Sequence, residues 1–137
     1  MPSVDKRVFV VSRPTVNKFG FTPNLSSAQQ YGRLEIVFEQ SDNPQFLPGP
    51  AVRKAFRVLR DFDCQRDAVL WAGGGDPTAV GICFAVLSSV TAAQRPQIIT
   101  MLRWERTLTD NGRDRKSGFY VPVPIELAKK DINNEHG

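Results

Sequence analysis

Hydrophobic residues fall in short blocks, some with the two-residue period of strands and others with the helical period. The run Val8–Val11 is β-branched and aromatic, which predicts a buried strand. Leu34, Ile36 and Phe38 alternate with polar neighbours and predict a second strand, with one face buried and the other in water. The polar segment between these strands has room for a short helix at residues 27–31.

An amphipathic helix is predicted after the second strand. Residues 41–50 have the composition of a loop, and Pro50 suits the first turn of a helix because its missing N–H has no helical partner there. Apolar residues at helical spacing then predict the buried face: Val52, Ala55, Phe56, Leu59 and Phe62. Basic residues lie on another side of this helix: Arg53, Lys54, Arg57 and Arg60.

A second strand–helix unit follows. Residues 68–72 are apolar throughout, which is typical of a strand buried on both faces in a parallel sheet. Gly73–Gly75 end this strand, Asp76 is a good N-cap, and Pro77 suits the first helical position. The helix from Pro77 to about residue 93 is apolar on nearly every side. It is therefore either enclosed by the sheet and a loop or packed against another chain, and Gly81 would let a neighbour come close.

Two strands are predicted at the end, over residues 98–106 and 119–127. Pro122 and Pro124 cannot donate ladder hydrogen bonds, so the last strand is expected at an edge with those positions facing outward. The order β-β-α-β-α-β-β predicts a single α/β domain over residues 1–127. Its central sheet is mostly parallel with right-handed crossovers, and a C-terminal antiparallel hairpin lies at its edge. Residues 128–137 are expected to form a flexible tail.

Composition adds constraints on compartment and partners. The 137 residues, 41% hydrophobic and 23% charged, fit one globular domain. The net charge of +4 weakly favours an acidic partner such as nucleic acid, although a solvated surface that happens to be basic also explains it. No signal peptide or membrane-length segment is present, so we expect a cytoplasmic protein without a membrane partner. Cys64 and Cys83 have no metal-ligand spacing, and whether they meet in a disulfide stays open.

No set of catalytic residues can be assembled from the sequence. The only histidine is His136, in the tail, so serine and cysteine triads lack their base and histidine-ligated zinc lacks its ligands. Asp61, Asp63 and Asp67 cluster after the first helix, where a polar loop explains them. We therefore predict no catalytic residue, no cofactor and no metal. The sequence favours a binding protein over an enzyme.

Two places could bind an anionic partner. The first is the strand–helix turn, where bare glycines and free helical N–H groups could hold a phosphate, a carboxylate or a nucleotide, although a tight turn with a good N-cap also explains it. Its candidate residues are Gly73, Gly74, Gly75, Asp76 and Thr78. The second is the basic C-terminal hairpin, a candidate for gripping nucleic acid phosphates and stacking bases, or else an ordinary solvated hairpin. Its candidate residues are Arg103, Trp104, Arg106, Arg113, Arg115, Lys116 and Tyr120, with Arg53, Arg57 and Arg60 of the first helix as a further basic face.

Three stretches also carry a resemblance: the segment Leu70-Trp-Ala-Gly-Gly-Gly-Asp-Pro, then Leu102-Arg-Trp-Glu-Arg, then Gly118-Phe-Tyr-Val-Pro-Val. Together with the apolar helix, these resemble small proteins of tailed bacteriophages, over most of the chain. The resemblance implies a viral protein acting in a bacterial cytoplasm, often by binding host or viral machinery. Its motifs have no assigned chemistry, and fold alone does not supply function.

Three functions remain open at this point. The first is a non-enzymatic binder of nucleic acid or of a complex that processes it. The second is a nucleotide or small-anion binder, either a sequestering protein or a weak enzyme, that uses residues 73–78. The third is a protein-binding or assembly factor that forms a homo-oligomer through the apolar helix 79–90 or adds its edge strand 119–127 to a partner's sheet.

Overall fold

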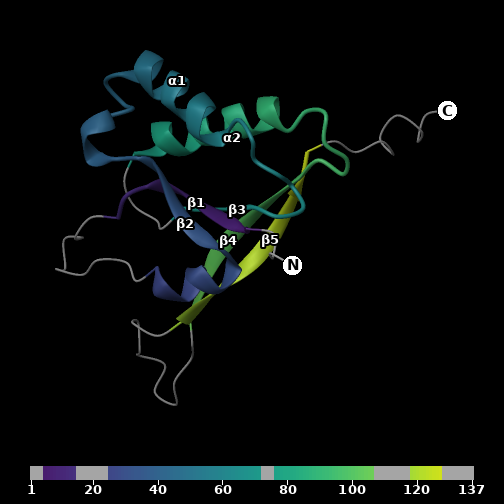
Figure 1. Cartoon of the computed structure of the whole chain (residues 1–137). Coiled ribbons are helices and arrows are strands. Elements are labelled where there is room, and N and C mark those ends of the chain that lie inside the picture. Colours follow the sequence, from purple (N-terminus) through teal and green to yellow (C-terminus); the bar gives the residue numbers. More distant parts are fainter. Residues whose placement is uncertain (1–4, 15–24, 72–75, 107–117, 128–137) are drawn as a thin grey trace, which may run out of the picture.

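The computed structural model describes residues 5–14, 25–71, 76–106 and 118–127 (Figure 1). Residues 128–137, predicted to be a tail, lie outside this part of the chain. Within these ranges the elements are two short 3-10 helices, two α-helices and five strands. In chain order they are β1 (Arg7–Ser12), η1 (Ser26–Tyr31), β2 (Arg33–Phe38), η2 (Gln40–Asp42), α1 (Pro48–Leu59), β3 (Ala68–Leu70), α2 (Pro77–Val90), β4 (Ile98–Arg106) and β5 (Gly118–Glu126).

The five strands form one sheet in the order β2-β1-β3-β4-β5. Strands β2, β1, β3 and β4 are parallel to their neighbours, and β4 pairs with β5 antiparallel. The predicted α/β class, the mostly parallel sheet and the antiparallel hairpin at its edge are confirmed. Parallel neighbours need long crossovers, which η1, α1 and α2 supply.

The two α-helices cover one face of this sheet and η1 lies on the other (Figure 1). Phe9 and Val11 point into the core on the helical side, while Val8 and Val10 point into a second core that includes Ala28 of η1. This placement explains why β1 is apolar at every position. We predicted that one face of β2 would be exposed to water. Val37 lies on that face but is only 1% exposed, because the helical layer covers it.

The buried side of α1 differs from the predicted one. Its buried residues are Ala51, Ala55 and Leu59, four positions apart, and this row packs against the rest of the helical-side core. Phe56 lies about 100° round the helix from Ala55, and its side chain is 41% exposed, so its prediction as a core residue is wrong. Phe62 is buried as predicted, although the helix has already ended at Leu59.

Other boundaries shift by a few residues. The helix α1 begins at Pro48, inside the predicted loop, and α2 ends at Val90, three residues early. Strand β3 ends at Leu70, and Trp71 beyond it is 40% exposed instead of buried. Cys64 and Cys83 are free thiols buried in the same core, so no disulfide joins them. Among the described residues, no helix has the length and apolar character needed to cross a membrane.

Candidate binding groove

The predicted anion-binding turn is only partly within the described structure. Residues 72–75, with all three glycines, lie outside it. Asp76 is the N-cap of α2, and its Oδ1 accepts a hydrogen bond from the N–H of Thr78 at 2.9 Å. A carboxylate thus already lies at the helix N-terminus, where its charge interacts favourably with the helix dipole and would repel a second anion.

Of the aromatic residues in the predicted nucleic-acid hairpin, Tyr120 is buried and Trp104 is half-buried against the same core cluster. Tyr120 is 3% exposed and its ring packs edge-on against Trp104, with centroids 4.9 Å apart. The hydroxyl of Tyr31 donates a hydrogen bond to the carbonyl of Tyr120 at 2.8 Å. Tyr120 therefore has no exposed face for a base, and its proposed stacking role is corrected.

Among the basic residues of that hairpin, Arg103 has a described side chain. Arg103 is exposed, but its Nη2 pairs with Glu105 at 2.6 Å. Arg106 ends β4, and Arg113, Arg115 and Lys116 lie outside the described residues. The hairpin hypothesis therefore stays a prediction for most of its residues.

Three arginines follow one side of α1 as far as its C-cap. Arg53, Arg57 and Arg60, called here the arginine row, are exposed, and no carboxylate in the described ranges lies within 4.0 Å of them. Arg13, Arg33 and Arg103 each pair with a glutamate on the surface instead. The row therefore carries positive charge that has no direct carboxylate partner in the described structure.

The acidic group whose charge interacts with Arg57, Asp42, is already engaged by another residue. Asp42 forms an ion pair with Lys54 and accepts a hydrogen bond from the N–H of Glu39 at 2.7 Å. Burial alone would raise the pKa of Asp42, but these hydrogen bonds and the charges of Lys54 and Arg57 hold that pKa below its ordinary value. Asp42 thus stays ionised and satisfied by Lys54.

An open groove of about 390 Å³ runs between α1 and α2, beside the arginine row. Apolar or small residues make up almost all of its lining: Val52 and Phe56 from α1, and Thr78, Gly81, Ile82, Ala85 and Val86 from α2. Sequence reasoning noticed the apolar α2 and Gly81 but missed the groove, because a groove between two helices depends on how they pack.

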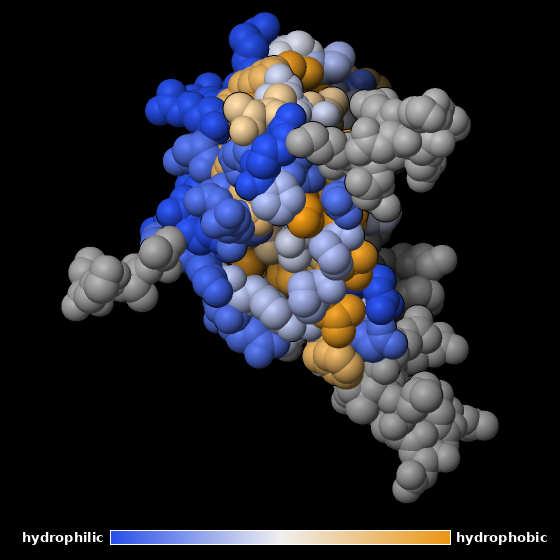
Figure 2. Space-filling model, turned by 90° about the vertical axis from the view of Figure 1, so that its right-hand side faces the viewer, coloured by the Kyte–Doolittle hydropathy of each residue, from blue (hydrophilic) through white to orange (hydrophobic). Residues whose placement is uncertain are grey.

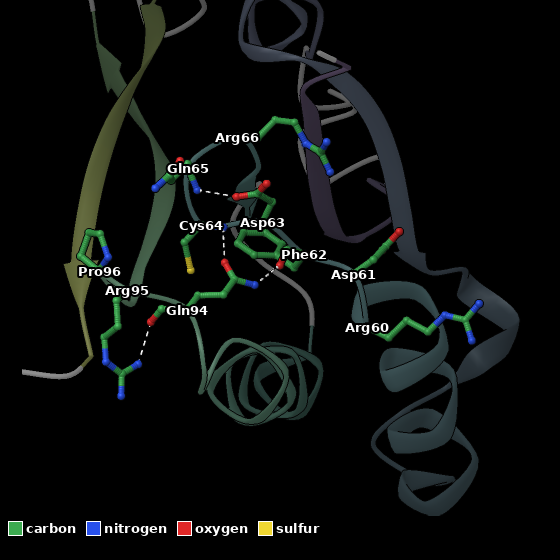
Figure 3. Close-up of a pocket in the computed structure, with 10 residues that line it drawn as sticks. All are labelled: Arg60, Asp61, Phe62, Asp63, Cys64, Gln65, Arg66, Gln94, Arg95 and Pro96. Carbon is green, nitrogen blue, oxygen red and sulfur yellow. Dashed lines mark hydrogen bonds between the residues drawn. The ribbon is translucent and has the colours of Figure 1, made fainter.

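A second cavity, also of about 390 Å³, is polar and lies between the α1–β3 and α2–β4 loops (Figure 3). Gln94 joins the two loops by hydrogen bonds: its Oε1 accepts from the Cys64 N–H at 2.7 Å, and its Nε2 donates to the Phe62 carbonyl. The guanidinium groups of the arginines that line it, Arg60, Arg66 and Arg95, point apart (Figure 3). The residues around this cavity therefore hold two loops together, and its arginine side chains do not point toward a common ligand position.

No catalytic chemistry emerges from the described side chains. Burial raises the pKa of the Cys83 thiol to about 12, so it stays protonated and is a poor nucleophile. Within the described ranges, no group of three or more histidine, cysteine or acidic residues could hold a metal ion. Asp67, from the acidic cluster noted in the sequence, is buried in an ion pair with Arg7 at 2.8 Å.

The β5 edge is a weaker interface candidate than the groove. Phe119 and Leu127 at its two ends are 45% and 39% exposed, and Figure 2, which faces this side, shows hydrophobic patches separated by hydrophilic residues. Pro122 and Pro124 lack the N–H groups that an added strand would need. The prolines thus limit pairing with a partner's sheet.

Comparison with known proteins finds one matching family. The family model described as Phage Pam3 gp32-like protein matches residues 6–127 of the chain. No curated protein and no solved structure matches it.

Proposed function

The chain belongs to the Phage Pam3 gp32-like protein family, and we propose that it is a non-enzymatic protein-binding module. Its α1–α2 groove takes an acidic amphipathic helix of a host or viral protein in the bacterial cytoplasm. One observation carries this proposal: an apolar groove lies open beside the arginine row, which has no carboxylate partner in the described structure. An amphipathic helix laid in a hydrophobic groove is a common mode of protein recognition.

The apolar lining favours protein over nucleic acid as the partner. A nucleic acid would engage the arginines through its phosphates and would stack bases on aromatic rings. Phe56 is the aromatic ring that the lining offers for stacking. Aliphatic side chains such as Val52, Ile82 and Ala85, by contrast, offer nothing to a phosphate or a base and would stay in water. An acidic amphipathic helix uses both features, since its apolar side covers the groove and its carboxylates form charge-assisted hydrogen bonds with the arginines.

Charge also disfavours a second copy of this chain as the occupant. The helix α2 contains no charged residue, so it offers no carboxylate to the arginine row of another copy. Two copies that met groove to groove would bring two arginine rows together, and like charges across an interface are unfavourable. A partner of opposite charge avoids this repulsion.

A designed peptide tests the proposal. The probe is a fluorescein-labelled amphipathic helix of about 20 residues, with alanine and leucine on one side and glutamate on a flank. We expect micromolar binding to the full-length protein by fluorescence anisotropy, and none for the same peptide with lysine replacing glutamate. The double variant Arg53→Glu/Arg57→Glu should weaken binding by about tenfold or more, because each acidic contact becomes a repulsion.

The matched control is Arg33→Glu/Arg103→Glu, which changes the net charge equally on exposed residues outside the groove. Equal loss in the control, or unchanged binding in the Arg53/Arg57 variant, overturns the proposal. So does tight, salt-sensitive binding of labelled 20-mer DNA through the same arginines without peptide binding, which would assign them to nucleic acid. A dimer in sedimentation that Ala85→Glu dissociates would make a second copy the occupant.

A further inference from the structure

Small residues follow one line along the exposed side of α2. Thr78, Gly81, Ala85 and Ser88 are spaced by three, four and three positions, the spacing of a seam that contacts another helix. Gly81, Ala85 and Ser88 are exposed, and the first three residues of this small-residue seam line the groove. The seam alone would be an ordinary solvated surface, but it lies in the apolar groove beside the arginine row, and one of its members, Gly81, is unusual in itself.

Gly81 is a glycine that the fold does not need. A Cβ placed on it would meet no atom of the described structure within 4 Å. Gly118, by contrast, leaves room for Trp104, whose ring a Cβ would approach to 2.4 Å. A glycine inside a helix also weakens it relative to alanine. Neither packing within this chain nor helix stability therefore accounts for glycine at this position.

We infer that Gly81 is the crossing point at which the bound helix approaches the backbone of α2. This inference rests on the proposed function and specifies the partner. The distance between packed helix axes depends on the side chains at the contact, and glycine permits the closest approach. The bound helix therefore carries glycine, alanine or serine where it crosses Gly81.

The charges fix a second feature of the partner. The arginine row lies on α1 and its C-cap, whereas α2 carries no charged side chain. The bound helix is therefore acidic on the flank that faces α1 and small or apolar on the flank that faces α2. This one-sided pattern distinguishes it from helices with acidic residues on both flanks.

The Gly81→Ala variant tests the inference with two acidic peptides that differ only at the central groove-facing position, alanine or leucine. Wild-type protein should bind the alanine peptide about fivefold or more tightly than the leucine peptide, because leucine would hold the helices apart. Gly81→Ala should weaken binding of the alanine peptide by a similar factor. Its melting temperature should rise by a few degrees, since alanine favours the helix, which shows that the loss is not misfolding.

The outcomes separate this inference from the proposed function. If wild type and Gly81→Ala bind the alanine peptide equally, or wild type prefers the leucine peptide, the crossing point is wrong while the acidic-helix proposal stands. If Gly81→Ala lowers the melting temperature, the glycine has a structural role and the inference is again wrong. If neither acidic peptide binds wild type, the proposed function fails and the crossing point fails with it.

Discussion

Replacing Asp67 with alanine is expected to destabilise the protein by about 3–5 kcal/mol, the usual effect of removing one partner of a buried ion pair. The Asp67 side chain is fully buried and Arg7 is 13% exposed. Its carboxylate accepts hydrogen bonds from Arg7 Nη2 at 2.8 Å, from the Arg7 N–H at 3.2 Å and from the Asp63 N–H at 2.9 Å. Alanine would leave a nearly buried guanidinium without its main partner and strand two backbone donors.

Urea unfolding followed by circular dichroism measures this effect, with an unchanged m-value as the sign of a comparable transition. Asp61→Ala is the matched control, because Asp61 also pairs with Arg7, at 3.3 Å, but its side chain is 68% exposed. We expect the control to cost less than about 1 kcal/mol, as exposed ion pairs do. If the two variants lost the same unfolding free energy, burial would not be the reason that the Asp67–Arg7 ion pair stabilises the protein. Arg7→Ala combined with Asp67→Ala should cost less than the sum of the two single changes.

The same ion pair shows where sequence reasoning stops. Local periodicity predicts the strands and helices, and the strand–helix–strand order with right-handed crossovers predicts a mostly parallel sheet. Asp67, however, looked like one of three loop carboxylates, since nothing local indicates a partner 60 positions away in the chain. The arrangement of β1 beside β3 in the sheet brings Arg7 and Asp67 together.

The candidate site was predictable only in its components. The basic face of α1 and the unusually apolar α2 are visible in the sequence, and they form the two sides of the groove. That Phe56 lines the groove instead of the core could not be predicted, because α1 packs through the narrower row of Ala51, Ala55 and Leu59. Tyr120 was misplaced for a related reason, since Trp104 and Tyr31 contact it from other elements.

Replacing Gly32 with alanine is expected to destabilise the protein by about 2–6 kcal/mol, the sum of backbone strain and overpacking. Gly32 has φ 153° and ψ 175°, a conformation that is nearly exclusive to glycine. A Cβ here would lie 2.7 Å from the backbone carbon and oxygen of Lys6 and 2.8 Å from the nitrogen of Arg7. The backbone of Lys6 cannot easily move away, because its carbonyl accepts the N–H of Arg33 at 2.8 Å where β2 begins beside β1.

Urea unfolding of Gly32→Ala and Gly81→Ala should give changes of opposite sign, although the chemical change is identical. Alanine restricts the unfolded chain similarly in both variants, so that contribution largely cancels in the comparison. The Gly81 variant gains helix propensity in open space, while the Gly32 variant meets backbone and a forbidden φ. A cost of several kcal/mol is a large part of the 5–15 kcal/mol typical of a domain, so Gly32→Ala should also unfold at a clearly lower temperature. If Gly32→Ala is as stable as wild type, the tight connection from η1 to β2 does not constrain the pairing of β1 with β2.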